Sequence, residues 1–464
     1  MENIFSFILS ILSWFGEYGI PFIVVLGVLV FVHEWGHYYV ARLCGVKVTQ
    51  FSIGFGKEIW GFEDKNGTRW KVSLIPLGGY VQMFGDTDPA SAGTSDKVNE
   101  ASDDGARTMT EEERKVAFFS QPLWQRAAIV FAGPAINFIF AIILLFGLYV
   151  SLGKPVTSPT ASAIVVGGAA YEAGIKPHDE IIEINGQKIL SFEAIQRAVL
   201  VDLNTGMDIT VLRDGQEVVF ENVEPELIKE EDRFGFQQSR GQLGIIGPGF
   251  QLDKNAISKI KGEEVAASTD KNSLLASLLG QEFEVSINQG DKEALNLLVA
   301  PKIDDNKTPQ DFEGAENFIM LASTSKNAQI VDLSVSESFF ESINETKVIV
   351  SSTMEALWQI ISGVRSAQEL GGIIRIGAIA GDAAQAGLIA LITFTALLSI
   401  NLGLINLFPI PMLDGGHLLF YAVEAIKGSP IPEQTQEYAF RFGLAILVAL
   451  MLFTNLNDIV QLVL

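Results

Sequence analysis

The sequence is short of cysteine, histidine and positive charge. Its 464 residues include one cysteine, Cys44, so no disulfide can form within the chain, and we expect Cys44 to be a small core residue. Four histidines occur, and 32 Lys and Arg stand against 55 Asp and Glu, which leaves a formal net charge of -23. Because nucleic acids and anionic lipid surfaces attract basic proteins, this balance argues against both as broad partners.

Charge is also scarce in four apolar stretches, which we expect to be membrane helices. About 20 helical residues cross roughly 30 Å of hydrocarbon. Stretches of this length occupy residues 18–43, 126–152, 386–408 and 442–464. No basic residue precedes the first stretch and no small-residue cleavage site follows it, so we expect a retained helix and not a cleaved signal peptide. The sequence therefore predicts a polytopic α-helical membrane protein with an N-terminal membrane part, 1–152, and a C-terminal one, 386–464.

Basic residues beside the predicted spans indicate the orientation of the chain. The tail 1–17 has none, whereas the loop 43–125 carries Lys47, Lys57, Arg114 and Lys115. The positive-inside rule therefore places loops 43–125 and 409–441 in the cytoplasm. Both termini and residues 153–385 are then expected on the opposite side of the membrane.

The remaining sequence divides by composition. Residues 88–113 are rich in Asp, Ser, Gly and Ala, which predicts a flexible, solvated loop. Residues 181–189 and 257–265 are similar, and each is followed by a predicted helix and a pair of strands, which indicates an internal duplication. The predicted pairs are 209–213 with 217–221, and 282–288 with 295–300.

These repeats define the expected outer region. We place one copy at residues 153–235 and the other at 236–330, with 232–241 as the linker between them. A helical connector is expected at 331–385, because apolar residues recur at helical spacing between 336 and 364. The connector helix either packs on neighbouring elements or lies on the membrane surface.

The motif His33-Glu34-Trp35-Gly36-His37 is the strongest chemical signal. On a helix, His33 and His37 lie one turn apart on one face, where both imidazoles can bind one Zn²⁺. Zinc activates a bound water, and Glu34 can then act as the general base. A chance pair of histidines is the alternative. It is disfavoured because each charge in an apolar span costs about 2.5–3.5 kcal/mol.

A catalytic zinc usually has three protein ligands, so a third is expected inside the membrane. The candidate is Asp414, in the segment 406–417, where two prolines interrupt the third predicted span. His417 is a rival ligand, and Asp414 could instead be a turn residue at a helix end. Asn406 could donate to the oxyanion of a tetrahedral intermediate, or it could bond a neighbouring helix.

These motifs together resemble the site-2 protease family, and within it the bacterial branch that regulates sigma E. The resemblance covers about residues 1–150 and 335–464. It rests on the segments 33–37, 51–56, 75–80, 133–138 and 406–417. It implies His33, His37 and Asp414 as ligands of one zinc ion, Glu34 as the base and Asn406 as a transition-state donor.

The resemblance also implies an activity and a cellular location. It implies an intramembrane zinc endopeptidase in a bacterial inner membrane, with the outer domains in the periplasm. The expected substrates are single-pass membrane proteins whose outer domain has been trimmed, such as an anti-sigma factor, and remnant signal peptides.

Residues 69–83 read as two short strands around Gly78-Gly79, and the resemblance interprets them as a re-entrant β-hairpin. A free strand edge can pair with an extended substrate backbone, and a helical peptide bond must be unwound before it is cut. An ordinary cytoplasmic hairpin is the alternative. On the re-entrant interpretation, substrate binding is assigned to Ile75, Pro76, Leu77, Gly78, Gly79 and Tyr80.

The duplicated outer region resembles a tandem of PDZ-like α+β domains. The stretch from Ala163 to Gly186 follows the permuted bacterial PDZ pattern, whereas the second copy lacks a clear helix start before Ile257. In the family, the tandem acts as a size filter for trimmed substrates. The chain also departs from the family at Gly371-Gly372, where Gly-Pro is common.

Two other functions would fit part of the pattern. One is a membrane-anchored PDZ binding module or chaperone without activity, which would not need Glu34 together with all three ligands. The other is a zinc protease that cuts soluble segments near the membrane surface, which the distant intramembrane position of Asp414 disfavours.

Overall fold

The computed structural model describes most of the chain from residue 13 onward. The described residues are 13–85, 97–98, 107–201, 206–232, 234–266, 271–289, 292–302, 318–320 and 329–463. Most of the loop predicted at 88–113 lies outside the described residues. Inside it, β3 (Lys97–Val98) pairs with β4 (Arg107–Thr108), and α3 (Glu111–Val116) begins at a capping box between Thr110 and Glu113.

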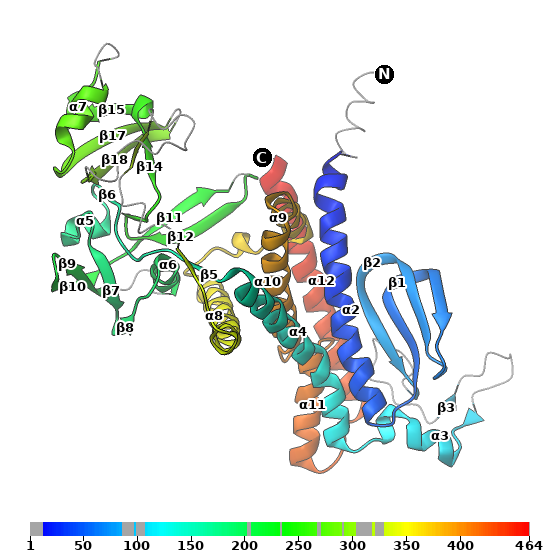
Figure 1. Ribbon diagram of the computed structural model, residues 1–464. Coiled ribbons are helices and arrows are strands. Elements are labelled where there is room, and N and C mark those ends of the chain that lie inside the picture. Colours follow the sequence, from blue (N-terminus) through cyan, green and yellow to red (C-terminus); the bar gives the residue numbers. More distant parts are fainter. Residues whose placement is uncertain are drawn as a thin grey trace, which may run out of the picture.

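In the described part of the chain, four helices are long and apolar enough to cross a membrane, which confirms the predicted spans. They are η1 with α2 (Phe15–Gly19, Ile20–Leu43), α4 (Leu123–Leu152), α10 (Leu388–Asn406) and α12 (Glu433–Val463). Figure 1 shows them as one bundle, with η1 and the C-terminal end of α12 at the same end. Buried side chains such as Leu145 and Ile400 join α4 to α10, whereas Met451 on α12 is exposed, as a lipid-facing position would be.

Two shorter helices flank the third span. α9 (Ile373–Ala386) is separated from α10 at Gly387, which has a φ of +110°. α11 (Asp414–Lys427) follows α10 inside the predicted loop 409–441, so that loop is partly helical.

The start of α9 is capped from the last span. The buried carboxylate of Asp458 on α12 accepts the backbone N–H groups of Gly372 and Arg375 at 3.0 Å. A side chain at Gly372 would approach Asp458 Oδ2 to 2.8 Å. Position 372 is glycine and not the proline of a Gly-Pro pair, so its backbone N–H is present and donates to Asp458. A proline has no N–H to donate.

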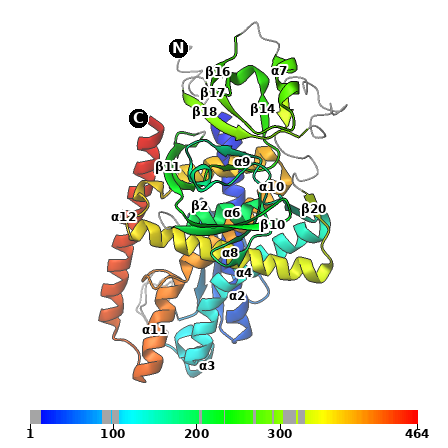
Figure 2. The same ribbon diagram turned by 90° about the vertical axis from the view of Figure 1, so that its left-hand side faces the viewer.

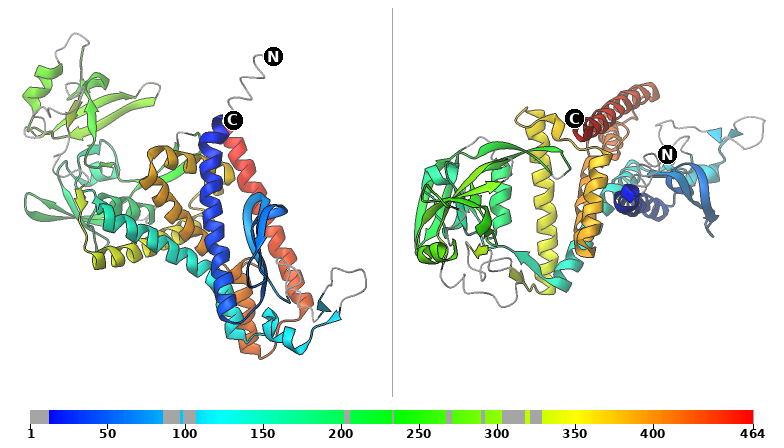
Figure 3. Two further views of the ribbon diagram at one scale, coloured as in Figure 1. Left: turned by 45° about the vertical axis from the view of Figure 1, so that its right-hand side comes forward. Right: turned by 90° about the horizontal axis from the view of Figure 1, so that it is seen from above.

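The strands next to α2 form a curled antiparallel sheet of β1 (Val48–Glu63) and β2 (Arg69–Met83). The prediction of a hairpin within 69–83 was wrong, because β2 is one strand and both of its halves pair with β1. Ile53 is opposite Gly79 on one side and Val72 on the other. The bends come from glycines with positive φ at Gly54 and Gly78, a conformation that costs other residues more. Figure 3 places this sheet and the outer strands on opposite flanks of the helix bundle.

The outer region contains two larger sheets, with strand orders β10-β9-β7-β8 and β13-β6-β18-β17-β15-β16. The pairs β9–β10 and β17–β18 confirm the two predicted strand pairs, and a helix precedes each. The strands are β6 (Ala163–Val165), β7 (Glu180–Ile184), β8 (Gln187–Lys188), β9 (Met207–Arg213), β10 (Gln216–Val223), β13 (Ile245–Ile246), β15 (Ile257–Ile260), β16 (Glu263–Glu264), β17 (Phe283–Gln289) and β18 (Lys292–Val299). The helices are α5 (Ala169–Ala173), α6 (Phe192–Val201) and α7 (Lys271–Leu278).

The two copies are joined more closely than the predicted boundary suggests. β6 belongs to the first copy by sequence, yet it pairs with β18 of the second. Its side chains alternate, so Ile164 enters one hydrophobic core and Ala163 the other. Two short pairs, β5 (Lys154–Val156) with β20 (Gln329–Val331) and β14 (Gln251–Asp253) with β19 (Phe318–Met320), complete the region.

The predicted linker 232–241 is also not a linker. It lies in a hairpin of β11 (Glu226–Glu231) and β12 (Gln237–Gln242). The turn of this hairpin contacts η1 and α12. Figure 1 shows this hairpin extending from the outer strands toward α9 and α12.

The predicted connector contains α8 (Val335–Ile361), which lies across the bundle in Figure 2. Phe339 packs on Phe146 of α4, and Thr353 donates to Asn401 of α10 at 3.1 Å. These contacts confirm packing on neighbouring elements. α8 also exposes Phe340 and Ile361, so its position on the membrane surface stays a prediction.

Candidate active site

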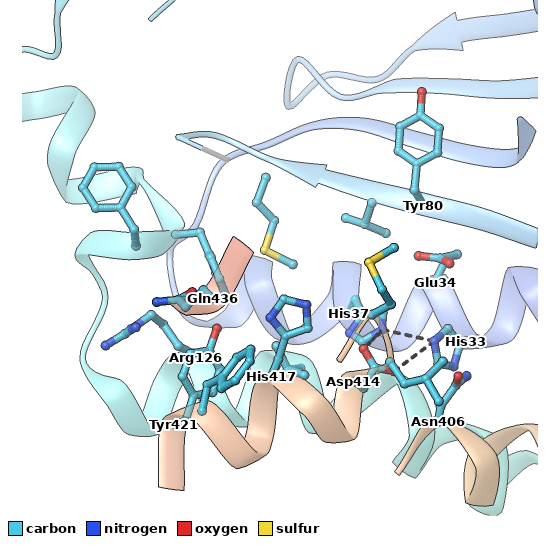
Figure 4. A pocket seen from close by; sticks show the side chains of 18 of the residues that line it. His33, Glu34, His37, Tyr80, Arg126, Asn406, Asp414, His417, Tyr421 and Gln436 are labelled. Carbon is cyan, nitrogen blue, oxygen red and sulfur yellow. Dashed lines mark hydrogen bonds and ion pairs between the residues drawn. The ribbon is translucent and has the colours of Figure 1, made fainter. Parts of the chain in front are cut away.

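The structure brings three of the predicted site residues together from two distant parts of the chain. His33 and His37 project from α2, and Asp414 is the first residue of α11. Asp414 Oδ2 lies 3.3 Å from His33 Nε2, and its Oδ1 lies 3.5 Å from His37 Nε2. The two Nε2 atoms are 3.2 Å apart, and Figure 4 shows all three side chains converging.

This arrangement fits a tetrahedral metal ion. Bonds of about 2.0–2.2 Å to nitrogen and oxygen keep tetrahedral ligand atoms roughly 3.3–3.6 Å apart. Two of the three observed distances, 3.3 and 3.5 Å, lie in that range, and the third, 3.2 Å, lies just below it. Two facing Nε2 atoms also need a cation or a proton between them, because both carry lone pairs in the ligating tautomer. The donor set of two imidazoles and one carboxylate is typical of catalytic zinc with one open position.

α4 forms the wall behind the histidines. His37 Nδ1 lies 2.9 Å from the carbonyl oxygen of Ile129, and Asn137 Nδ2 lies 3.0 Å from His33 Nδ1. A side chain at Gly133 would collide with His37 Nε2 and would lie 2.9 Å from His33 Cε1. The close approach of α4 to α2 therefore depends on glycine at this position.

Asp414 reaches the histidines because the chain turns tightly after α10. Met412 in this turn has a φ of +87°, which is unusual for a residue with a side chain. A side chain at Gly415 would collide with the carbonyl oxygens of Leu407 and Phe408, and one at Gly416 would collide with that of Ile410. The two glycines therefore allow this close turn.

Glu34 lies between the metal-ligand group and β2. Its side chain is 8% exposed, and a Cβ at Gly79 would come within 3.0 Å of Glu34 Cγ and 2.6 Å of the Ser52 carbonyl oxygen. Only glycine lets β2 pass this close to α2. The strand therefore lies directly beside the predicted base.

These residues line a cavity of about 920 Å³ that also contains Asn406 and His417. His417 lines the cavity but is not part of the group formed by His33, His37 and Asp414, so the geometry selects Asp414 over its rival. Asn406 ends α10 and faces the cavity near Asp414 in Figure 4.

Part of the predicted substrate-binding segment lines the cavity, and part of it does not. Gly78, Gly79 and Tyr80 line it, and the Tyr80 hydroxyl donates to Gln50 Oε1 at 3.2 Å. Ile75 and Pro76 are not among the residues that line the cavity. The structure does not describe the side chain of Leu77.

Sequence reasoning missed several residues of the site. Asn137 was part of the motif 133–138, and a polar residue within an apolar span was a usable signal. Arg126 and Glu424 form a 2.6 Å ion pair at the other end of the cavity. They are 298 positions apart, so no local pattern could have joined them.

Comparison with known proteins agrees with this geometry. The family model described as "Peptidase family M50" matches residues 21–450. The chain belongs to this family, the site-2 proteases. The resemblance inferred from the motifs is thereby confirmed.

Full-length relatives support the same assignment. A protein named as a zinc metalloprotease in Agrobacterium fabrum is 36% identical over 449 residues, covering 96% of each chain. The regulator of sigma E protease of Haemophilus influenzae is 31% identical over 459 residues, covering 95% of this chain and 98% of its own. The chain is a metalloprotease of this family with zinc as its cofactor, and His33, His37 and Asp414 are the residues placed to hold the ion.

Proposed function

We propose that this protein is an intramembrane endopeptidase that cuts the transmembrane segments of single-pass membrane proteins. The observation that carries the proposal is the position of the metal-ligand group relative to the candidate membrane spans. His33 and His37 lie within the span Phe15–Leu43, and Asp414 follows the span Leu388–Asn406 after one turn. A protease with its ligands at this position acts on peptide bonds that enter between membrane helices.

Each residue has a distinct role in the proposed reaction. When bound, zinc supplies a Lewis acid that activates the attacking water. Glu34 accepts the proton of that water and passes it to the leaving amine nitrogen. Asn406 donates a hydrogen bond to the oxyanion of the tetrahedral intermediate. We assign His33, His37 and Asp414 as the three zinc ligands.

β2 is the proposed substrate-binding strand. Its second half, from Gly79 to Met83, pairs with β1 on one side, and Gly79, Tyr80, Val81 and Met83 line the cavity on the other. An extended substrate can add to this edge, which satisfies its backbone groups once its helix has unwound. Ile75, Pro76 and Leu77 would extend the same edge beyond the cavity.

The outer sheets support a proposal about substrate choice. We assign them as a tandem of PDZ-like domains whose bulk excludes substrates with an intact outer domain and admits those in which it has been trimmed. Because one relative is named regulator of sigma E protease, an anti-sigma factor is the proposed substrate, with remnant signal peptides as a second group. We place the protein in a bacterial inner membrane, with both termini and the outer sheets periplasmic and loops 43–125 and 409–441 cytoplasmic.

The proposal is tested with the full chain in detergent and a single-span test protein, comparing the parent with Glu34→Gln. We expect a cut within the apolar segment, located by mass, that a zinc chelator blocks. Glu34→Gln should abolish the cut while zinc stays bound, because it removes the base and no ligand. Absence of a cut in several trimmed substrates, with zinc bound, would instead favour a membrane-anchored binding module.

A further inference from the structure

Asn137 is a buried polar residue that the proposed reaction does not use. Its side chain is 0% exposed within α4, and its Oδ1 atom has no hydrogen-bond partner in the described part of the chain. A buried amide oxygen without a partner destabilises the fold, so its presence in an apolar helix calls for a reason. The amide lies against His33, with Nδ2 3.0 Å from His33 Nδ1.

Metal binding through His33 Nε2 determines which kind of hydrogen-bond partner His33 Nδ1 needs. Its Nε2 atom faces Asp414 and His37, so Nε2 must carry the lone pair that binds the ion. The neutral ring then carries its proton on Nδ1, which must donate to an acceptor. Asn137 supplies such an acceptor in Oδ1. Turning the amide by half a rotation exchanges Oδ1 and Nδ2 within the same volume.

The other histidine, His37, already has a hydrogen-bond acceptor at its Nδ1 atom. His37 Nδ1 lies 2.9 Å from the carbonyl oxygen of Ile129, one of the backbone acceptors of α4. A carbonyl oxygen accepts only, so it selects the tautomer of His37 with a proton on Nδ1 and a lone pair on Nε2. The Nδ1 atoms of both His33 and His37 therefore contact polar groups of α4.

We propose that Asn137 is a positioning residue that holds His33 in its zinc-binding tautomer, by accepting the Nδ1–H of His33 through its amide oxygen. The inference rests on the zinc-binding part of the proposed function and not on the identity of the substrate. Its test therefore measures zinc affinity and needs no cleavage.

The test compares variants of the purified full chain in detergent by competition with a chelator of known zinc affinity. Asn137→Leu keeps the volume and removes the acceptor, so we expect about 10–100-fold weaker zinc binding. Asn137→Asp keeps an acceptor oxygen and should bind zinc within about tenfold of the parent or more tightly. Asn137→Ala serves if Asn137→Leu does not fold, and should weaken zinc binding to the same degree.

Ser399→Ala is the matched control. Ser399 donates to the backbone carbonyl of Asn137 at 2.8 Å, so this change disturbs the same contact between α4 and α10 without touching the amide. It should leave zinc affinity unchanged. Parent-like affinity in Asn137→Leu would overturn the proposal. A loss in Asn137→Asp as large as that in Asn137→Leu, or larger, would also overturn it, since a packing role predicts that the buried charge of Asp is the more damaging change.

Discussion

Two glycines of α4 show how strongly the site depends on single residues. A side chain at Gly133 would collide with both His33 and His37, whereas one at Gly147 would have nothing within 4 Å of its first atom. Both lie inside the same continuous helix, and glycine in a helix costs about 1 kcal/mol relative to alanine. That cost is justified by packing only at Gly133.

We therefore expect Gly133→Ala to weaken zinc binding about tenfold or more, because the added methyl group displaces His37 from its ligand position. The matched Gly147→Ala change should leave zinc content unchanged and should not lower the thermal midpoint. Zinc content by atomic absorption, with thermal unfolding in the same detergent, checks both. Equal behaviour of the two variants would contradict this account of Gly133.

A second residue-scale prediction concerns the third ligand. Asp414→Asn should reduce zinc retention during dialysis, because a neutral amide is a poorer ligand than a carboxylate. His417→Asn should retain zinc, since His417 lines the cavity outside the ligand group. Unchanged zinc content in Asp414→Asn would remove Asp414 from the ligand set.

At the scale of elements, the turn between β1 and β2 is organised by one carboxylate. Asp64 Oδ1 accepts the backbone N–H groups of Asn66 at 2.8 Å and Thr68 at 3.0 Å. Its Oδ2 accepts the Trp70 indole N–H at 3.1 Å and the Tyr38 hydroxyl at 3.2 Å. The turn thus holds the sheet to α2, the helix that carries the histidines.

This network predicts a pH dependence of the sheet. Burial by itself would raise the pKa of Asp64, but the hydrogen bonds from Thr68, Trp70, Asn66 and Tyr38 lower it overall. A carboxyl with a lowered folded-state pKa stabilises the fold fully above its unfolded value of about 3.9, and this stabilisation is lost as the pH falls through the folded value. We expect Trp70 to report loosening of the turn below about pH 4.

The control for this prediction is Asp64→Asn, which keeps one acceptor oxygen and does not titrate. Its tryptophan fluorescence should differ from that of the parent above about pH 4, and the difference should shrink as the parent is acidified. A parent signal that follows the Asn variant at every pH would show that Asp64 does not organise the turn.

At the scale of the whole molecule, the hairpin β11–β12 connects the outer sheets to the membrane helices. Phe236 at its turn is 1% exposed and lies under the guanidinium of Arg375 on α9, 5.1 Å from the ring centre. The backbone N–H of Gln237 donates to Gln461 on α12 at 3.0 Å, and Phe234 contacts Tyr18 of η1 edge-on. The outer region is therefore held to the first and last spans at one place.

Phe236→Ala should release this contact. Truncating a buried phenylalanine costs about 3–5 kcal/mol, so backbone amides of the hairpin should exchange hydrogen markedly faster. Val219→Ala, at an exposed position on β10, is the control and should leave exchange in the hairpin unchanged. Equal exchange in both variants would show that the hairpin is held by other contacts.

Much of the fold follows from patterns within short segments. The four spans were predicted because each is a continuous apolar run of sufficient length, and the pairs β9–β10 and β17–β18 because adjacent strands are joined by short turns. The errors came from pairings that no local pattern shows. β2 was expected to fold on itself, yet both of its halves pair with the preceding strand β1, and β6 pairs with β18, which lies more than a hundred positions away.

The sequence by itself determined the spacing of His33, Glu34 and His37, because helical periodicity puts residues i and i+4 on one face whatever surrounds them. It also favoured Asp414 over its rival His417 as the third ligand. Only the tertiary structure brought Asp414 to the two histidines with His417 outside that group, and only it placed Asn137 and Ile129 behind the two imidazoles. Those contacts depend on how closely α4 and α11 approach α2, which is set by the packing of Gly133, Gly415 and Gly416 against distant backbone and side-chain atoms.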